Sequence, residues 1–569
     1  MKEAANTLWK RLRLKDWTPF LIFTVPLGFL AIFLFWPLVT TFLRSFMGPG
    51  FETNFGTFTL ENFNMFLTSS LYLRSLKNSL IVSFSVMFFS LLIGIPMGYV
   101  TARVKLPFKS LILALGILPI ILPSFVGAFS WIILLGRQGA VRKILNPLLS
   151  MLGLSLPPIT GMFGMIFVMT MTYYPFVFLL CHGAFDSANP LLEEAAMIMG
   201  ASRWRIFRTI SLPLILPSIG AGAIIVFIRA MGNFGIPSII GGDQYVLPTL
   251  IYFQVSGFWN INGAAAISLV SILITAVALI LQKYMVSRRQ YETLSASRSE
   301  HHLHTHPLAR LLSGLFVLSI LLVSLAPQIT MFIMSFFKQW YGIAPKGFTL
   351  ENYLRIPEVA SKTIYNSLYL SFTATLISGI LGCLVAYITE RKKPKGAFLL
   401  DMAIMAPFIL PGTVVAVAII STFAGPPLAI GGTYTIIILA YVIRRTPYVY
   451  RSVVASLTQL NPALEESSWI SGASWFYTFR KVSLPLILPA VLTGMTLTFS
   501  TLLQELSTTI LLYSARTRTV PIQIYGAVAD GKFGEASALS VLLILTVFLI
   551  VYAANRWQGK NFSGGLKIG

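Results

Sequence analysis

Residues 193–217 read EEAAMIMGASRWRIFRTISLPLILP, and residues 465–489 read EESSWISGASWFYTFRKVSLPLILP. Fifteen of the 25 aligned positions are identical, at an offset of 272 residues. Each copy is polar and bounded by prolines, whereas long apolar runs flank it on both sides. A polar element that recurs between apolar runs predicts two related halves with equivalent contact points on one face of the protein.

The apolar composition predicts a membrane protein. Of 569 residues, 56% are hydrophobic and only 11% are charged, and the mean hydropathy is +0.78. Ordinary soluble domains do not reach these values. Apolar runs of about 20 residues, the length that crosses a hydrocarbon core, recur along the chain. We therefore predict an all-α integral membrane protein with twelve transmembrane helices, arranged as two parallel six-helix modules.

The predicted spans fall into two sets of six. Those of the first half cover residues 19–42, 75–100, 110–135, 161–181, 212–232 and 263–285. Those of the second half cover residues 308–336, 364–389, 397–423, 433–453, 484–506 and 534–554. Because each half has an even number of spans, the halves have the same orientation. A pseudo-twofold axis along the membrane normal is then expected to relate them.

The distribution of positive charge predicts the orientation. Of the 42 lysines and arginines, 25 fall in the segments on one side and 13 on the other. Positively charged loops stay on the cytoplasmic side, so both polar repeats and both chain ends are expected in the cytoplasm. The net charge of +23 does not indicate nucleic-acid binding, since no sizeable soluble basic domain carries it. The partner it indicates is the lipid bilayer.

The repeat also predicts the domain boundaries. Residues 1–286 form the first module and residues 308–569 the second, joined by a polar cytoplasmic linker at 287–307. The linker histidines suggest either a metal site or a solvated segment with adventitious affinity; they are His301, His302, His304 and His306. The first half has 16 additional residues, which we assign to a short external surface helix within 136–159.

Both polar repeats carry the signals of a short helix followed by a tight turn. We name residues 189–217 the first polar loop and residues 461–489 the second polar loop. In each loop an acidic pair falls in the first helical turn, where the helix dipole favours it, and a glycine follows where the helix ends. A second short helix then presents aromatic residues beside an arginine, namely Trp204, Phe207 and Arg208 in the first loop and Phe476, Phe479 and Arg480 in the second. This arrangement suits insertion into a groove of a soluble partner; the alternative is an amphipathic loop lying on the lipid surface.

One motif in these loops resembles a known family. Glu194-Ala195-Ala196, three residues, Gly200, nine residues and then Ile210-Ser211-Leu212-Pro213 is similar to the EAA signature of permeases of binding-protein-dependent ABC importers. The second loop has Glu466, Gly472 and the same closing pattern, with serines in place of both alanines. Both halves resemble six-helix permease modules of type I importers, so the resemblance covers essentially the whole chain.

The resemblance implies the partners. In this family the loop is the coupling helix that fits a cleft on an ATPase subunit, which implies two ATPase copies, an external or periplasmic substrate-binding protein and a bacterial inner membrane. The residues implied to contact the ATPase are Glu193, Glu194, Ala195, Gly200, Arg208, Glu465, Glu466, Gly472 and Arg480. The chain contains no GxxxxGK[ST] phosphate-binding motif. We therefore expect a transport subunit that is not an enzyme and binds no cofactor, with ATP used by the partner.

The substrate follows less directly from the resemblance. Residues 440–456 and 499–514 are most similar to ferric iron permeases. Fused permeases for thiamine, 2-aminoethylphosphonate or polyamine remain alternatives. A different class is an ion-coupled secondary transporter, which would need carboxylates within its spans; Asp401 and Glu505 are the best candidates. A membrane scaffold without transport is a third interpretation.

Charged residues within spans suggest a translocation path, because such charges are costly and face cavities or other helices. The candidates are Arg229, Asn233, Arg444, Arg445 and Glu505. Asn233 and Glu505 occupy equivalent positions, and we hypothesise that they line the external mouth, where the carboxylate could bind a ferric ion. Alternatively, Glu505 pairs with an arginine such as Arg516 or Arg518 and only fixes the external loop, and Arg444 and Arg445 have a structural role between helices or snorkel to the interface. Residues 233–242 and 505–514 are predicted to be external gate loops or plain connections.

Overall fold

The computed structural model describes residues 18–48, 58–188, 191–287, 307–340, 342–394 and 396–561. The predicted linker and its four histidines lie outside these residues, apart from its first and last positions. Helices make up almost all of the described secondary structure. The strands found there are β1 (Phe337–Gln339) and β2 (Lys346–Phe348), which pair antiparallel.

The helical elements, with η marking a π-helical turn, follow the chain in two series. In the first half they are α2 (Thr18–Leu30), η1 (Ala31–Phe35), α3 (Trp36–Ser45), α4 (Glu61–Thr68), α5 (Ser70–Arg103), α6 (Lys109–Ile121), α7 (Ser124–Leu135), α8 (Ala140–Ser150), α9 (Met162–Ser187), α10 (Leu191–Ile198), α11 (Arg203–Ile206), η2 (Phe207–Ser211), α12 (Leu212–Met231), α13 (Gly235–Ile240), α14 (Leu247–Ser256) and α15 (Ile261–Ser287). In the second half they are α16 (Pro307–Met334), α17 (Glu351–Leu354), α18 (Ile356–Val359), α19 (Ser361–Tyr387), η3 (Ile388–Lys392), α20 (Ala397–Ile409), α21 (Gly412–Phe423), α22 (Tyr434–Gln459), α23 (Ala463–Ile470), α24 (Trp475–Thr478), η4 (Phe479–Ser483), α25 (Leu484–Leu503), α26 (Thr509–Leu512), α27 (Val520–Ala529) and α28 (Phe533–Asn561).

Each predicted span coincides with a long helix or with a bent pair of helices. Among the described residues, nine helices are long and apolar enough to cross a membrane, or up to eleven if each bent pair is one span. The tenth predicted span, α22, is not among them, and it carries three arginines, Arg444, Arg445 and Arg451. Length and composition therefore support an all-α membrane protein without establishing the number twelve. The predicted surface helix is present as α8.

Two predicted spans are not continuous helices. α6 and α7 meet at an angle of 98°, and α20 and α21 meet at 110°. Each break lies at a Leu-Pro pair, where Leu122 and Leu410 are extended. Proline disfavours the helical conformation in the residue before it, and it cannot donate a backbone hydrogen bond. The predicted spans over 110–135 and 397–423 are therefore each divided into two helices at the Leu-Pro pair.

The core of each half is a contact between three helices. In the first half, Gly94 of α5 and Gly222 of α12 both lie against Val177 of α9; a Cβ on Gly94 would stand only 2.7 Å from the valine Cβ. In the second half, Gly382 of α19 and Gly494 of α25 lie in the same way against Val449 of α22. Small residues let helix backbones approach closely, which is how helices associate in lipid.

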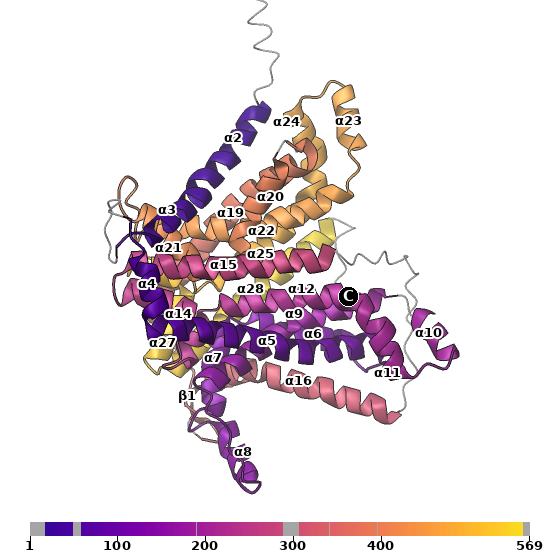
Figure 1. The fold of residues 1–569 in the computed structure, drawn as a ribbon, viewed down its shortest axis with the longest axis vertical. Helices are drawn as coiled ribbons and strands as arrows, with labels where there is room; N and C mark the ends of the chain where they lie inside the picture. The colour runs from indigo at the N-terminus through magenta and orange to yellow at the C-terminus, as the bar shows by residue number, and fades with distance from the viewer. Residues whose placement is uncertain are drawn as a thin grey trace, which may run out of the picture.

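The first helix of each half packs on the other half. The first span contacts the second half, α2 against α19 and α3 against α21, and α16 packs against α6 and α7 of the first half. Each also contacts its own half, α3 through α15 and α16 through α28. Figure 1 shows α2 beside the orange helices and α16 beside α5 and α6. The apolar cluster that contains Leu30 and Leu34 includes Leu370 and Phe423 of the second half. The first helix of each module therefore lies against the other module, and we call these two helices the exchanged first helices.

Candidate functional site

The two polar loops have the same fold. The turn after α10 contains Gly200, which has a φ of 82°, and the turn after α23 contains Gly472, which has a φ of 83°. After each glycine, an alanine N–H returns to a carbonyl five residues earlier, Ala201 to Ala196 at 3.0 Å and Ala473 to Ser468 at 3.1 Å. This is a Schellman turn, whose left-handed residue favours glycine. The predicted turn and second short helix, α11 or α24, are confirmed in both loops.

Apolar side chains are exposed at the tips of both loops. Ile198 and Met199 are 88% and 87% exposed in the first loop, and Ile470 is 87% exposed in the second. Sequence reasoning missed these three residues, although their position just before the turn glycine could have identified them. Trp204 and Phe476 are exposed as expected. Both loops project from the right-hand side of the bundle in Figure 1.

The inner aromatic residue of each loop points back to the bundle. Phe207 packs on Tyr99 with ring centroids 5.2 Å apart, and Phe479 packs on Tyr387 at 5.1 Å. Phe479 also stacks on Trp475. These contacts attach the loop to the second long helix of its half. Phe207 and Phe479 are therefore partly buried and do not belong to the exposed surface.

The first acidic residue of each loop is buried, which differs from the exposed docking role that the resemblance implied. Glu193 Oε1 lies 3.1 Å from Arg103 Nη2 at the end of α5 and accepts a hydrogen bond of 2.9 Å from Ser211. Arg103 Nη2 also donates to the Ala188 carbonyl. This network links the start of the loop, its end and α5, so Glu193 positions the loop.

The second loop repeats the network. Glu465 Oε1 lies 3.2 Å from Arg391 Nε and accepts from Ser483 Oγ at 2.8 Å, while Oε2 accepts from Tyr387 at 2.9 Å. Arg103 and Arg391 are equivalent, at an offset of 288 residues. Sequence reasoning missed both arginines; their matching places after the second span of each half were the available signal.

The remaining predicted docking residues lie at or near the loop surface. Glu194 is partly buried, and the exposed members are Ala195, Gly200, Arg208, Glu466, Gly472 and Arg480. Their docking role stays a prediction.

Three predicted path residues come together in the second half. Arg444 Nη1 and Arg445 Nη2 of α22 each form an ion pair with Glu505, one to each carboxylate oxygen. Glu505 Oε1 also accepts from the Thr508 backbone N–H at 3.1 Å. Glu505 thus pairs with arginines, as the alternative expected, but the partners are not Arg516 or Arg518, because α22 places its own arginines directly beside the outer end of α25. We name Arg229, Arg444, Arg445 and Glu505 the arginine cluster.

The equivalent position in the first half is neutral. Asn233 donates to Tyr173 Oη at 2.5 Å and to Ser124 Oγ at 3.2 Å, and its Oδ1 accepts from the Ile236 N–H at 2.8 Å. Tyr173 and Arg445 are equivalent residues, as are Asn233 and Glu505, at the same offset of 272. A tyrosine–asparagine pair in one half therefore replaces an arginine–glutamate pair in the other.

The remaining arginine connects the halves. Arg229 of α12 donates to Tyr448 Oη at 3.3 Å, and its guanidinium lies over the rings of Phe176 and Phe408 at 5.6 and 5.4 Å. Tyr448 and Phe408 belong to the second half, and Arg445 lies 5.7 Å from the centre of the Tyr448 ring. The arginine cluster thus lies where α12 meets α22, with Tyr448 between its members.

Each predicted gate loop contains a short helix. Residues 233–242 contain α13 and residues 505–514 contain α26, and both short helices are mostly buried. Asn233 and Glu505 each accept one backbone N–H from three residues later, Ile236 in α13 and Thr508 just before α26. Both side chains are buried in this conformation, and neither forms an open external mouth.

No metal site is evident in the described part of the chain. Within it there is no group of three or more His, Cys, Asp or Glu residues that could hold a metal ion. Both oxygens of Glu505 are engaged by arginines. In this conformation Glu505 therefore offers no free carboxylate to a cation.

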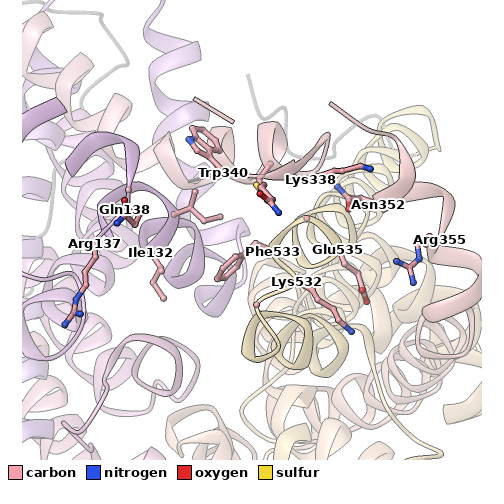
Figure 2. Close-up of a pocket in the computed structure, with 17 residues that line it drawn as sticks. Ile132, Arg137, Gln138, Lys338, Trp340, Asn352, Arg355, Lys532, Phe533 and Glu535 are labelled. Atoms are coloured by element: carbon pink, nitrogen blue, oxygen red, sulfur yellow. The ribbon is translucent and has the colours of Figure 1, made fainter. Parts of the chain in front are cut away.

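A separate pocket of about 390 Å³ lies at the end of the bundle opposite the polar loops. Figure 2 shows Ile132 and Gln138 from the first half facing Trp340 and Phe533 from the second. The Gly342 N–H donates to the Gln138 carbonyl at 3.0 Å across this seam. No residue of the arginine cluster lines the pocket. Because its lining residues come from both halves, the pocket belongs to the interface between the halves.

The profile of one family matches both halves of the chain. The family is described as the binding-protein-dependent transport system inner membrane component, and the matches cover residues 90–291 and 378–563. The chain belongs to this family. Each match contains one polar loop and its tethering glutamate, so the duplicated element falls in the shared region. The chain is therefore an inner membrane transport component with two fused modules.

Relatives extend this similarity over nearly the full length. The ferric transport system permease protein FbpB of Actinobacillus pleuropneumoniae is 28% identical over 96% of this chain and 80% of its own length. The putative ferric transport system permease protein FbpB 1 of Haemophilus influenzae is 29% identical over 90% of this chain and 81% of its own. The putative 2-aminoethylphosphonate transport system permease protein PhnV of Salmonella choleraesuis is 26% identical over 41% of this chain and 90% of its own.

The tether of the first polar loop is testable with a double-mutant cycle. We expect Arg103→Gln and Glu193→Gln each to lower the free energy of unfolding by about 3 kcal/mol, because each leaves a buried charge unpaired. The double variant should lose less than the sum of the two. Unfolding in mixed micelles measures these values, with the exposed Arg208→Gln as control. Strictly additive losses would show that the two side chains do not interact.

The space that admits Arg444 is also testable. A Cβ at Gly412 would stand 2.5 Å from Arg444 Nη1 and 2.8 Å from Thr508 Oγ1. We expect Gly412→Ala to displace the guanidinium and to cost about 1–3 kcal/mol of stability, measured by thermal unfolding. Gly183→Ala is the control, since no atom lies within 4 Å of its added Cβ. Equal stability of the two variants would contradict this account of the site.

Proposed function

We propose that the chain is the transmembrane permease subunit of an ATP-driven importer that carries ferric iron delivered by an external binding protein. The observation that supports it most is the pair of tethered loops with exposed apolar tips, one in each half. The full-length similarity to ferric transport permeases supports iron as the substrate.

The polar loops are suited to receive movement from a partner. Each presents an apolar tip, yet a buried ion pair and an aromatic contact connect it to the second long helix of its half. An ATPase that grips both tips would transmit its closure to α5 and α19. Two copies of the ATPase suit two equivalent loops, and ATP would bind to those partners.

Alternating access then follows from the packing of the halves. The three-helix cores make each half a stiff unit, while the exchanged first helices keep the two halves together as they move. Rocking about the pseudo-twofold axis would separate α12 from α22 and open the contact at Arg229 and Tyr448. The path would thus open alternately to the two sides.

The proposed setting is a bacterial inner membrane with the polar loops in the cytoplasm. The excess of lysine and arginine on the loop side supports this orientation. The external binding protein would then approach the opposite end, near α8 and the β1–β2 hairpin. The module boundaries at 286 and 308 remain part of this proposal.

We expect Ile198→Asp to prevent docking of the ATPase, because a charge at the loop tip would be buried without a partner on binding. Co-purification of the ATPase and uptake should both fall at least about tenfold. Leu152→Asp is the matched control. Leu152 is also a highly exposed aliphatic residue, but it lies just after α8, at the opposite end of the bundle. Normal ATPase recovery with Ile198→Asp would contradict the docking role.

The substrate is tested by uptake into proteoliposomes that hold the permease, its ATPase and its binding protein. We expect ATP-dependent accumulation of radiolabelled ferric iron. 2-Aminoethylphosphonate is the second candidate, favoured by the buried arginines and by the similarity to PhnV. Accumulation of the phosphonate without iron would reject the iron assignment and keep the importer class. Uptake that persists without ATP, driven by an ion gradient, would reject the importer class itself.

A further inference from the structure

The arginine cluster has more positive than negative charge. The cluster contains three guanidinium groups and one carboxylate, and within the described residues Arg444 and Arg445 form ion pairs with Glu505 alone. Arg229 forms no ion pair there and donates to the neutral Tyr448 hydroxyl. Unbalanced charge within membrane spans is costly and marks functional sites. The cluster therefore has an uncompensated charge of two positive units.

The guanidinium groups also have unused hydrogen-bond donors. Arg445 is only 8% exposed, and its buried Nε has no hydrogen-bond partner among the described groups. Each guanidinium carries five N–H donors, of which the two ion pairs use few. The side chains of Arg444 and Arg445 nevertheless retain 14% and 10% of their accessible surface. The cluster is thus enclosed without being sealed, and it can still donate.

The comparison of the halves argues against a purely structural role. In the first half Asn233 starts α13 with the same backbone hydrogen bond that Glu505 makes at α26, and no charge is needed. Thr172 and Tyr173 stand where Arg444 and Arg445 stand in the second half. In addition, Gly412 leaves the space that the Arg444 guanidinium fills, where the equivalent Ser124 carries a side chain. The fold does not require the arginines at this position.

We infer that the arginine cluster is a binding site for a small oxyanion between the two halves. Guanidinium groups bind phosphate and carboxylate oxygens through paired, charge-assisted hydrogen bonds. A bare cation would meet net positive charge here. If the substrate is ferric iron, as in the proposed function on which this step rests, the iron crosses together with oxyanion ligands. Glu505 then holds the arginines in place and competes with the anion for them.

Binding of radiolabelled inorganic phosphate tests the site directly. The full chain is placed in phosphatidylcholine nanodiscs, at constant ionic strength set with chloride. We expect saturable binding that Arg445→Gln weakens at least tenfold. Arg445→Lys should give an intermediate loss, since it keeps the charge but not the paired geometry. Arg137→Gln, at an exposed arginine outside the cluster, should bind as the unchanged protein does.

The sign of the Glu505→Gln effect distinguishes an anion site from a cation site. Because the carboxylate competes for the arginines, its removal should tighten phosphate binding several-fold. Absence of saturable binding, unchanged binding in Arg445→Gln, or weaker binding in well-folded Glu505→Gln would overturn the inference. Thermal unfolding identifies variants that fail to fold. If Arg445→Gln is among them, the phosphate affinity of Arg445→Lys decides whether Arg445 takes part in binding. Phosphate binding without iron uptake would reject iron as the substrate and keep the anion site. Iron uptake without phosphate binding would reject the anion site and keep iron as the substrate.

Discussion

Each polar loop depends on one buried carboxylate, Glu193 or Glu465, that joins its two ends to the second long helix of its half. A buried carboxylate is tolerated only with charged and hydrogen-bonding partners, and here an arginine and a serine supply them. The tether makes the loop stiff at its base, while the glycine turn leaves apolar residues exposed at its tip. A loop attached only by apolar contacts could shift on the bundle at little energetic cost. Separating a buried ion pair costs several kcal/mol, roughly 3–5, because it leaves an uncompensated charge.

The two halves share their scaffold and differ at their contact. Their three-helix cores use the same glycines and valine, and their loops use the same turn. Near the contact of α12 with α22, however, the first half has the neutral pair Asn233–Tyr173, where the second half has the charged pair Glu505–Arg445. Duplication thus supplied a symmetric frame, and substitution at a few positions produced one asymmetric polar site within it. A substrate that passes between the halves would meet Arg229 from the first half and Arg444, Arg445 and Glu505 from the second.

Local patterns in the sequence predicted much of the fold. The apolar runs located every long helix, because a membrane span is recognised by length and composition. The turn at Gly200 and Gly472 was predictable because a Schellman turn depends on neighbouring residues. Arg444, Arg445 and Glu505 were each recognised as costly charges, yet their pairing was not, since α22 and the end of α25 lie 60 residues apart in the chain.

The sequence by itself determined the membrane class, the twofold repetition and the position of both polar loops. The first follows from the apolar composition, and the other two follow from the residues that the two halves have in common. Only the tertiary structure decided that Glu193 faces inward to Arg103, that Arg444 and Arg445 pair with Glu505, and that the first helix of each half packs on the other. These features depend on which surfaces meet across long sequence separations. Periodicity and propensity are local properties, so they specify helices but not the partners that helices choose.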